Sequence, residues 1–518
     1  MSKVKNDSIF SLINSLSKSE KWQFKVYANR LNKTGNKIFV EAFDIISGQK
    51  EYNEQELLSI EKLKPSQVPN IKQNLYKQIL ASLSNSSVMS QENQVTRYVE
   101  HAKFLYNKCL YNDCLIIIEK AKRAARENYQ LIMMLELLEL EKAAIIQTAN
   151  DNISERIDKS VQEITEVSRQ LQNINRFSNL SVRLTAFYQH VGFIRDNKDL
   201  KSVRDYYNKN FPEFNIRDLS ELEQLYLYST ITSFYFFVQD FNKGYKYAKK
   251  WLQVFEHNPK LIKAKTELYI KALNNVLVAQ NKLFLYAEFK EIHQRLVSLK
   301  RQKQIILTEN LQLNLFKAIY IHEINRHFML GEFKSGTRIV NALEKDLMNF
   351  IPKLNRNTVM IFDYKIACLY FGNYQFKVSI KWLNKIINEK TSDLREDLQS
   401  FARILRLICY FELEDAEMIN YNVKATYRFL QKKHSFVKYQ QLIMDFLRNS
   451  KKTDTRSNTI ARFGQLKKNM QKLENNRFEK RAFIYFDIVS WLESKIENKS
   501  MQEIVQQKAS RYISKTSV

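Results

Sequence analysis

The chain has little glycine, proline or cysteine. Its 518 residues include only 8 glycines and 5 prolines. A sheet protein of this length needs more turn residues, so the scarcity favours helices joined by short polar loops. The four cysteines show no metal-ligand spacing, and we expect them to be small buried side chains in a reducing compartment. They are Cys109, Cys114, Cys368 and Cys409.

Long apolar runs are lacking as well. No stretch reaches the roughly 18 uncharged apolar residues of a membrane-spanning helix. The N-terminal 21 residues have neither a long apolar core nor a small-residue cleavage site, so we expect no signal peptide and a cytoplasmic location. Hydrophobic residues still make up 44% of the chain, which excludes a disordered protein. The length indicates several domains or one elongated repeat array.

Acidic residues are the minority among the charges. The formal net charge is +27, which suits an acidic partner such as nucleic acid, an anionic membrane surface or an acidic protein. The alternative, which we favour, is a solvated surface rich in lysine. The bias is strongest over residues 431–481, where 14 Lys and Arg stand against 4 Asp and Glu.

Motifs for catalysis or metal binding are missing. His322 and His327 lie five residues apart, whereas a helical zinc protease needs two histidines four apart on one face. "GEFKSGT" imitates a phosphate loop at Gly331 and Gly336, but Thr337 replaces the required lysine and no strand precedes it. We therefore expect no catalytic residue, metal or cofactor, and no enzyme. A site assembled across repeats is the alternative left open.

The chain does contain a recurring pattern of large and small residues. Phe241 is followed by Gly244, Ala248 and Trp251 at offsets of three, seven and ten. Two further copies keep these offsets, and two weaker copies begin at Leu200 and at Tyr374. The second of these reaches its small residue about two positions late, which indicates an insertion. The further copies are Tyr111, Cys114, Ile118 and Ala121, and Phe333, Gly336, Val340 and Leu343; the weaker ones include Val203, Tyr207 and Ser379.

Helix-hairpin packing explains this pattern. A small residue early in the second helix lets the first helix approach closely, and larger residues at later turns fill the space between hairpins. The pattern resembles the tetratricopeptide repeat, in a longer unit of about 41–46 residues. Further hairpins are expected near Ile153, Leu283 and Glu412. The positions that usually hold glycine in that family are Cys109, Gln239, Gly331 and Gly372.

Residues 1–90 show a different pattern, which predicts a small helical domain or a cap. Ser17 and Glu20 form a capping box for a helix from Lys18. A second helix should stop at Gly48, and a third should begin after Asn53 as its cap. Two prolines break the chain before a fourth helix. They are Pro65 and Pro69, and the apolar stripe of that helix is Ile71, Leu75, Ile79 and Leu83.

The rest of the chain divides into three predicted parts. Residues 95–435 form the tetratricopeptide-repeat-like α-solenoid. Residues 436–500 form a basic helical cap, and residues 501–518 form a frayed tail. The fold class is therefore all-α, and stacking of hairpins supplies the core.

Several segments resemble a family of uncharacterised helical proteins from Bacteroidota bacteria. They are "SLSKSEKWQFKVYA", "NLYKQILASL", "YFELEDAEMINYNVKATYRFLQKK" and "RAFIYFDIVSWLESKI". The resemblance would cover most of the chain. It implies a helical repeat and no activity.

The leading functional hypothesis is a protein-interaction scaffold, in which the first helices of the hairpins line a groove for a protein or peptide that could be acidic. The expected groove residues are Tyr226, Ser229, Ser233, Phe236, Ile321, Asn325 and Phe328. The alternative is nucleic-acid binding through the basic stretch and the fourth N-terminal helix. That helix would present Lys72, Gln73, Lys77 and Gln78 outward. The basic stretch offers as base-stacking aromatics only Phe436, Tyr439, Phe446 and Phe463, which we expect to be core.

Overall fold

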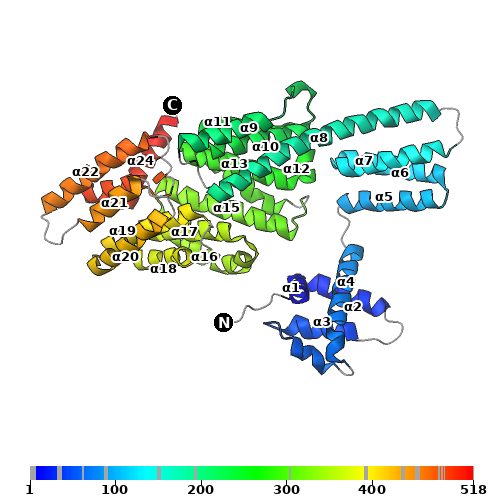
Figure 1. Cartoon of the computed structure of the whole chain (residues 1–518), viewed down its shortest axis with the longest axis horizontal. Coiled ribbons are helices and arrows are strands. Elements are labelled where there is room, and N and C mark those ends of the chain that lie inside the picture. Colours follow the sequence, from blue (N-terminus) through cyan, green and yellow to red (C-terminus); the bar gives the residue numbers. More distant parts are fainter. Residues whose placement is uncertain are drawn as a thin grey trace. The chain divides into compact units, whose positions relative to one another are not determined.

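The structure, a computed structural model, is all-helical over the residues that it describes (Figure 1). The chain divides into two compact units, Met1–Ile153 and Ser154–Val518. The all-α prediction is confirmed. The described residues are 7–31, 38–60, 63–86, 91–148, 153–191, 194, 196–302, 305–389, 395–432, 438–449, 456–476, 479, 482–483 and 485–516.

The first unit begins with a small bundle that has its own core. As predicted, Ser17 and Glu20 cap the second helix through reciprocal hydrogen bonds. The segment capped by Asn53 is a 3-10 helix rather than an α-helix, and Pro69 lies in the first turn of the next helix instead of breaking the chain. The elements are α1 (Ser8–Ser15), α2 (Lys18–Leu31), α3 (Ile38–Gly48), η1 (Glu54–Ser59), η2 (Pro65–Gln67) and α4 (Val68–Ser86).

Three antiparallel helices complete the first unit: α5 (Gln91–Asn107), α6 (Tyr111–Glu127) and α7 (Leu131–Ile146). A buried ion pair joins the last two, with Lys122 Nζ 2.8 Å from a carboxylate oxygen of Glu141.

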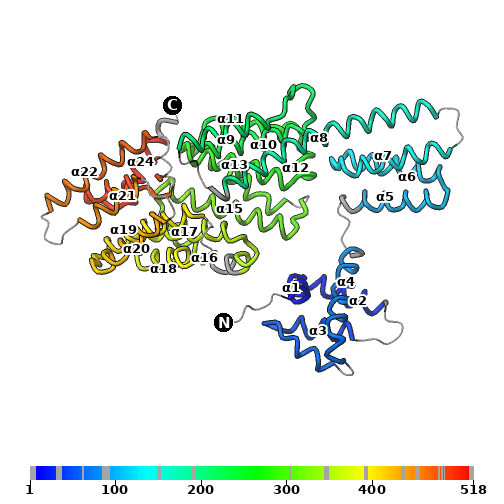
Figure 2. The backbone as a smooth tube through the Cα atoms, viewed as in Figure 1, coloured from blue at the N-terminus to red at the C-terminus, as the bar shows by residue number. Residues whose placement is uncertain are grey.

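Helical hairpins also build most of the second unit, as the path of the chain shows in Figure 2. Each second helix of a hairpin packs against the first helix of the next one. Near Ile153, where we expected a hairpin, the structure has the start of one long helix, α8. The elements are α8 (Ile153–Val191), α9 (Asn197–Asn210), η3 (Ile216–Asp218), α10 (Glu221–Phe237), α11 (Phe241–His257), α12 (Lys260–Ala264), α13 (Thr266–Leu283), α14 (Tyr286–Ser298), η4 (Leu299–Arg301), α15 (Glu309–Leu330), α16 (Phe333–Phe350), η5 (Ile351–Lys353), α17 (Arg356–Gly372), α18 (Phe376–Ile387), α19 (Glu396–Glu412) and α20 (Ala416–Lys432).

One turn geometry recurs seven times between successive helices. The residue two positions before the second helix has a positive φ, and the next residue donates its N–H to the carbonyl five residues earlier. This is the bond of the Schellman motif, which satisfies a carbonyl at the end of the first helix. The seven residues with positive φ are Cys109, Tyr129, Gln239, Phe284, Gly331, Tyr374 and Glu414.

The recurring pattern falls on the second helices of these hairpins. The small residue at offset three is buried in α6, α11, α16 and α18. A Cβ atom at Gly244 would stand 2.3 Å from the Phe236 ring of α10, which shows how closely the two helices approach. The buried small residues are Cys114, Gly244, Gly336 and Ser379.

Both weaker copies need correction. The copy that we began at Tyr374 lies on α18, and this helix begins at Phe376, so Ser379 stands at the regular offset of three. The turn residue with positive φ before this helix is Tyr374 rather than Gly372. Ser379 came two positions late in the predicted copy only because that copy began two positions before the helix does, and no insertion is needed. Leu200 is the fourth residue of α9 rather than the first, so that copy is out of register.

The end of the chain packs on the array instead of fraying. Helices α21 (Lys438–Arg448), α22 (Arg456–Glu474) and α23 (Ile488–Glu497) are followed by α24 (Met501–Thr516). The tail predicted to fray is thus mostly helix, and it buries Met501, Ile504 and Val505.

Helices α23 and α24 cross the turns of four consecutive hairpins in reverse order. Trp491 and Lys495 bind the carboxylate of Glu412, and the Met501 N–H donates to the Tyr374 hydroxyl at 2.9 Å. The Gln506 amide reaches the Gly331 carbonyl at 3.4 Å, and the Tyr512 ring stacks on Phe284 with centroids 5.2 Å apart. We call this segment, residues 488–512, the C-terminal strap.

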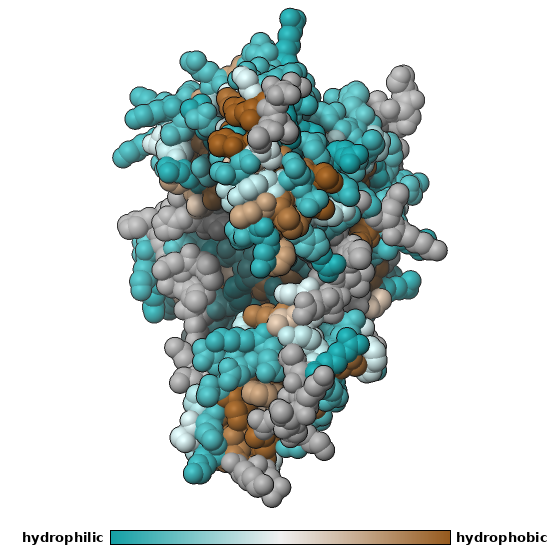
Figure 3. All heavy atoms as spheres, turned by 90° about the vertical axis from the view of Figure 1, so that its right-hand side faces the viewer, coloured by the Kyte–Doolittle hydropathy of each residue, from teal (hydrophilic) through white to brown (hydrophobic). Residues whose placement is uncertain are grey.

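Hydrophobic residues on the face drawn in Figure 3 gather in patches among hydrophilic ones. None of the described helices combines the length and apolar character needed to cross a membrane.

Candidate functional site

The four predicted groove residues of α10 lie on one stripe. All four are half-buried. Phe236 covers Gly244 within its own hairpin, and the Ser233 hydroxyl donates to the Ser229 carbonyl at 2.9 Å. Tyr226 completes the stripe, and burial raises the pKa of its hydroxyl. At least Phe236 is therefore a packing residue.

The three predicted groove residues of α15 include two that meet a lysine. Asn325 is buried, while Ile321 and Phe328 are half-buried. The Lys365 ammonium from α17 donates to Asn325 Oδ1 at 2.6 Å and lies 5.6 Å from the centre of the Phe328 ring. The structure thus brings Asn325 and Phe328 together around a cation that the sequence argument missed.

A second lysine, Lys282 near the end of α13, lies close to this cluster. Burial, together with the nearby charge of Lys365, lowers its pKa to about 7. Burial likewise lowers the pKa of Lys365 to about 8. Neither lysine forms an ion pair with a described residue. These two half-buried lysines beside α15, neither with a counter-charge among the described residues, are called the lysine pair.

His322 contributes the other buried polar group of the cluster. Its Nε2 atom lies 3.0 Å from Asn274 Oδ1, and its Nδ1 atom lies 3.4 Å from the Asn325 amide nitrogen. Burial lowers its pKa to about 3, with the nearby charge of Lys365 among the further causes. His322 is therefore neutral at physiological pH and adds hydrogen-bonding capacity rather than charge.

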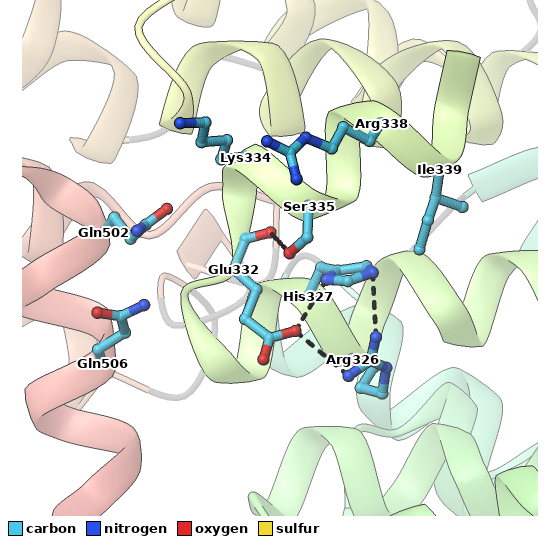
Figure 4. Close-up of a pocket in the computed structure, with 9 residues that line it drawn as sticks. All are labelled: Arg326, His327, Glu332, Lys334, Ser335, Arg338, Ile339, Gln502 and Gln506. Atoms are coloured by element: carbon cyan, nitrogen blue, oxygen red, sulfur yellow. Dashed lines mark hydrogen bonds and ion pairs between the residues drawn. The ribbon is translucent and has the colours of Figure 1, made fainter. Parts of the chain in front are cut away.

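The one pocket described lies where α24 crosses the α15–α16 turn (Figure 4). Its volume is about 650 Å³. Gln502 and Gln506 of α24 stand on one side, and α16 provides the opposite side. The lining residues from α15, the turn and α16 are Arg326, His327, Glu332, Lys334, Ser335, Arg338 and Ile339.

Part of this pocket is an internal ion-pair network, in which two carboxylates share one guanidinium. Arg326 binds Glu323 at 2.9 Å and Glu332 at 3.2 Å. Although burial raises the pKa of Glu323, hydrogen bonds from His327 and Arg326 lower it to about 2. His327 is only 1% exposed, and its Nδ1 atom lies 3.1 Å from the Glu332 carboxylate.

The residues that pointed to nucleic acid divide between surface and fold, and Gln73 and Lys77 are exposed on α4 as expected. Lys72, expected to face outward, pairs with Asp7 at 2.5 Å and Glu54 at 2.6 Å. The aromatic residues of the basic stretch are core, as predicted, where the structure describes them. They are Tyr439, Phe446 and Phe463; Phe436 lies outside the described residues.

The remaining sequence candidates have structural roles. His322 and His327 bind different partners, and no described group of three metal-ligating side chains comes together. Gly331 adopts the positive φ of the α15–α16 turn. The backbone carbonyl of Gln502 also packs against it and would stand 2.9 Å from an added Cβ atom. Three cysteines are buried as expected, but Cys109, in a turn, is exposed.

A sequence signal for the lysine pair did exist. Lys365 interrupts the apolar run "VMIFDYKIACLYF", and a lysine in such a run is rarely buried without a reason. Lys282 stands near a helix end among polar neighbours and gave no comparable signal.

No family model, curated protein or solved structure matches the chain. The conclusions about function therefore come from its own geometry.

Proposed function

We propose that the chain is a scaffold of tetratricopeptide-repeat type that binds an acidic segment of a partner protein. The surface concerned is the face made by the first helices of the hairpins, α10, α13, α15, α17 and α19. Each of these contacts the next, so they form a continuous layer in the second unit. Repeat arrays of this kind bind extended partners along such a layer.

The observation that carries the proposal is the lysine pair. Both lysines are half-buried, the pKa of each is lowered, and no described residue forms an ion pair with Lys282 or Lys365. A carboxylate from a partner would favour their protonated forms and supply the missing counter-charge. The half-buried Phe328 beside Lys365 offers an apolar contact next to the charge. The matching ligand is therefore a peptide in which acidic and apolar residues alternate.

Selection from a random peptide pool on the immobilised full-length chain tests this proposal. We expect enrichment of peptides that combine Asp or Glu with aliphatic or aromatic residues. The double variant Lys282→Gln/Lys365→Gln should lose that enrichment. A matched control is Lys377→Gln/Lys381→Gln, an exposed pair one turn apart on α18, which should keep it.

Two results would overturn the proposal. One is enrichment of peptides without acidic residues. The other is submicromolar, sequence-dependent binding of a random DNA or RNA pool near physiological salt, because unspecific attraction to a basic protein is much weaker there.

A further inference from the structure

We propose that the pocket between α15, α16 and α24 binds a phosphate group. The site is separate from the lysine pair, and it follows from the charges and donors that line it. Figure 4 shows the residues that surround the space.

The first step concerns the charge that remains after internal pairing. Arg326 pairs with both Glu323 and Glu332, so two carboxylates share one guanidinium. Lys334 and Arg338, one turn apart on α16, are exposed and form no ion pair with a described residue. Arg326, Lys334 and Arg338 together outnumber the two carboxylates by one positive charge, and the two cations outside the network are Lys334 and Arg338.

The second step concerns the opposite wall. Gln502 and Gln506 are also one turn apart, on α24, and both line the pocket. The Gln506 amide makes a long hydrogen bond of 3.4 Å to the Gly331 carbonyl. The Gln502 side chain makes no hydrogen bond to a described residue. Two helices thus present a pair of donors each to the same space.

The third step concerns the floor of the pocket. The 18-residue helix α16 begins at Phe333, so its first-turn N–H groups and the positive end of its dipole lie beside Lys334 and Ser335. The buried His327 also lines the pocket, and its Nδ1 atom lies 3.1 Å from the Glu332 carboxylate, so this imidazole holds Glu332 in place instead of facing a ligand.

A phosphate group fits this arrangement better than a carboxylate. Its oxygens point in several directions, and the donors come from opposite walls. A guanidinium and an ammonium together are a common phosphate-binding set. The site differs from a phosphate loop, because no strand precedes it and its lysine, Lys334, lies within the first turn of the helix.

A bound phosphate would also tie the C-terminal strap to the array. Lys334 and Arg338 belong to the α15–α16 hairpin, whereas Gln502 belongs to the strap. Binding to the folded chain alone shifts unfolding to higher temperature. The site would therefore couple ligand binding to closure of the strap over the turns.

Calorimetric titration of the full-length chain tests the proposal. The probes are inorganic phosphate and O-phosphoserine at constant ionic strength, with chloride as the reference salt. We expect saturable binding to the wild type. The variant Lys334→Gln/Arg338→Gln should bind at least about tenfold more weakly, since two charge-assisted hydrogen bonds are lost. Tighter binding of O-phosphoserine would identify a phosphate ester as the ligand, and equal binding would identify the phosphate group alone.

The control uses the equivalent positions on α18, the second helix of the following hairpin. Lys377 and Lys381 stand one and five residues after the start of α18, as Lys334 and Arg338 do on α16, but they are not among the residues that line this pocket. The variant Lys377→Gln/Lys381→Gln should bind phosphate like the wild type. Three results would overturn the proposal: no saturable heat with the wild type, unchanged binding in the α16 variant, or equal loss in both variants.

Discussion

At the scale of single residues, the fold places unfavourable backbone conformations in its turns. Six of the seven positive-φ turn residues are not glycine, and each such residue costs about 1–2 kcal/mol against a right-handed conformation. Stability lost there has to be regained in the helix contacts. The same positions are therefore sites where the chain could be stabilised by one substitution.

The clearest such site is Glu414, an exposed turn residue. We expect Glu414→Gly to raise the free energy of unfolding by about 0.5–1 kcal/mol, since relief of the left-handed strain outweighs the entropy that glycine adds to the unfolded chain. Urea denaturation would measure it. Glu414→Ala, which keeps the Cβ atom, should give no gain; a similar gain from alanine would show that strain is not the cause.

The lysine pair predicts a pH dependence of stability. Because the pKa of Lys282 is near 7 in the folded chain and 10.5 as its ordinary value, the folded state binds fewer protons between these values than the unfolded state. Lys282 therefore lowers the free energy of unfolding by its full amount below about pH 7, and this destabilisation disappears as pH rises toward 10.5.

Lys282→Met should therefore stabilise the chain more at pH 7 than at pH 9.5. Urea midpoints of wild type and variant at both pH values would show this. An equal difference at the two pH values would contradict the lowered pKa.

At the scale of elements, small residues set how closely the helices of a hairpin pack. Ala248 is fully buried on α11, between Gly244 and Trp251. The sequence was sufficient to predict the buried face of α11, because the same offsets recur in other copies. It did not give the correct start of α18, because both Tyr374 and Phe376 are aromatic residues that could begin the pattern.

Ala248→Leu should lower the free energy of unfolding by about 1–3 kcal/mol through overpacking. Lys246→Leu, at an exposed position of the same helix, is the control and should change little. Thermal denaturation of both variants is the measurement. Unchanged stability of Ala248→Leu would show that this face is not packed as described.

Helix α24 is the part of the C-terminal strap that the sequence did not reveal. The contacts of the strap lie far away in the chain, at Glu412, Tyr374, Gly331 and Phe284. Such pairings depend on the path of the whole array. The local sequence pattern of residues 501–518 therefore predicted a frayed tail.

Removal of residues 501–518 should destabilise the second unit, because burial of each large apolar side chain contributes about 1.5–3 kcal/mol and the strap buries Met501, Ile504 and Val505. A shorter truncation that removes only the last two residues is the control. Urea denaturation followed by circular dichroism would compare them. Equal midpoints for both truncations would mean that the strap adds no stability.

At the scale of the whole molecule, composition and the repeated offsets were enough to predict an all-helical chain but not the surface that we propose binds a partner. Scarce glycine and proline and the repeated offsets are properties of the local sequence. The lysine pair depends on α13 and α17 lying on either side of α15, and only the folded array brings these helices together. Of the predicted groove, Asn325 and Phe328 lie at this site, and their partner lysines came from the structure.

The measurement that tests the central claim most directly is carbodiimide cross-linking of a selected acidic peptide to the full-length chain, followed by mass spectrometry. This reagent joins a carboxylate to an amine in contact with it. The account predicts cross-links at Lys282 and Lys365, with none at the control pair Lys377 and Lys381. Cross-links concentrated instead on the lysines of α22 would contradict it, because the peptide would then bind the general basic surface of the chain.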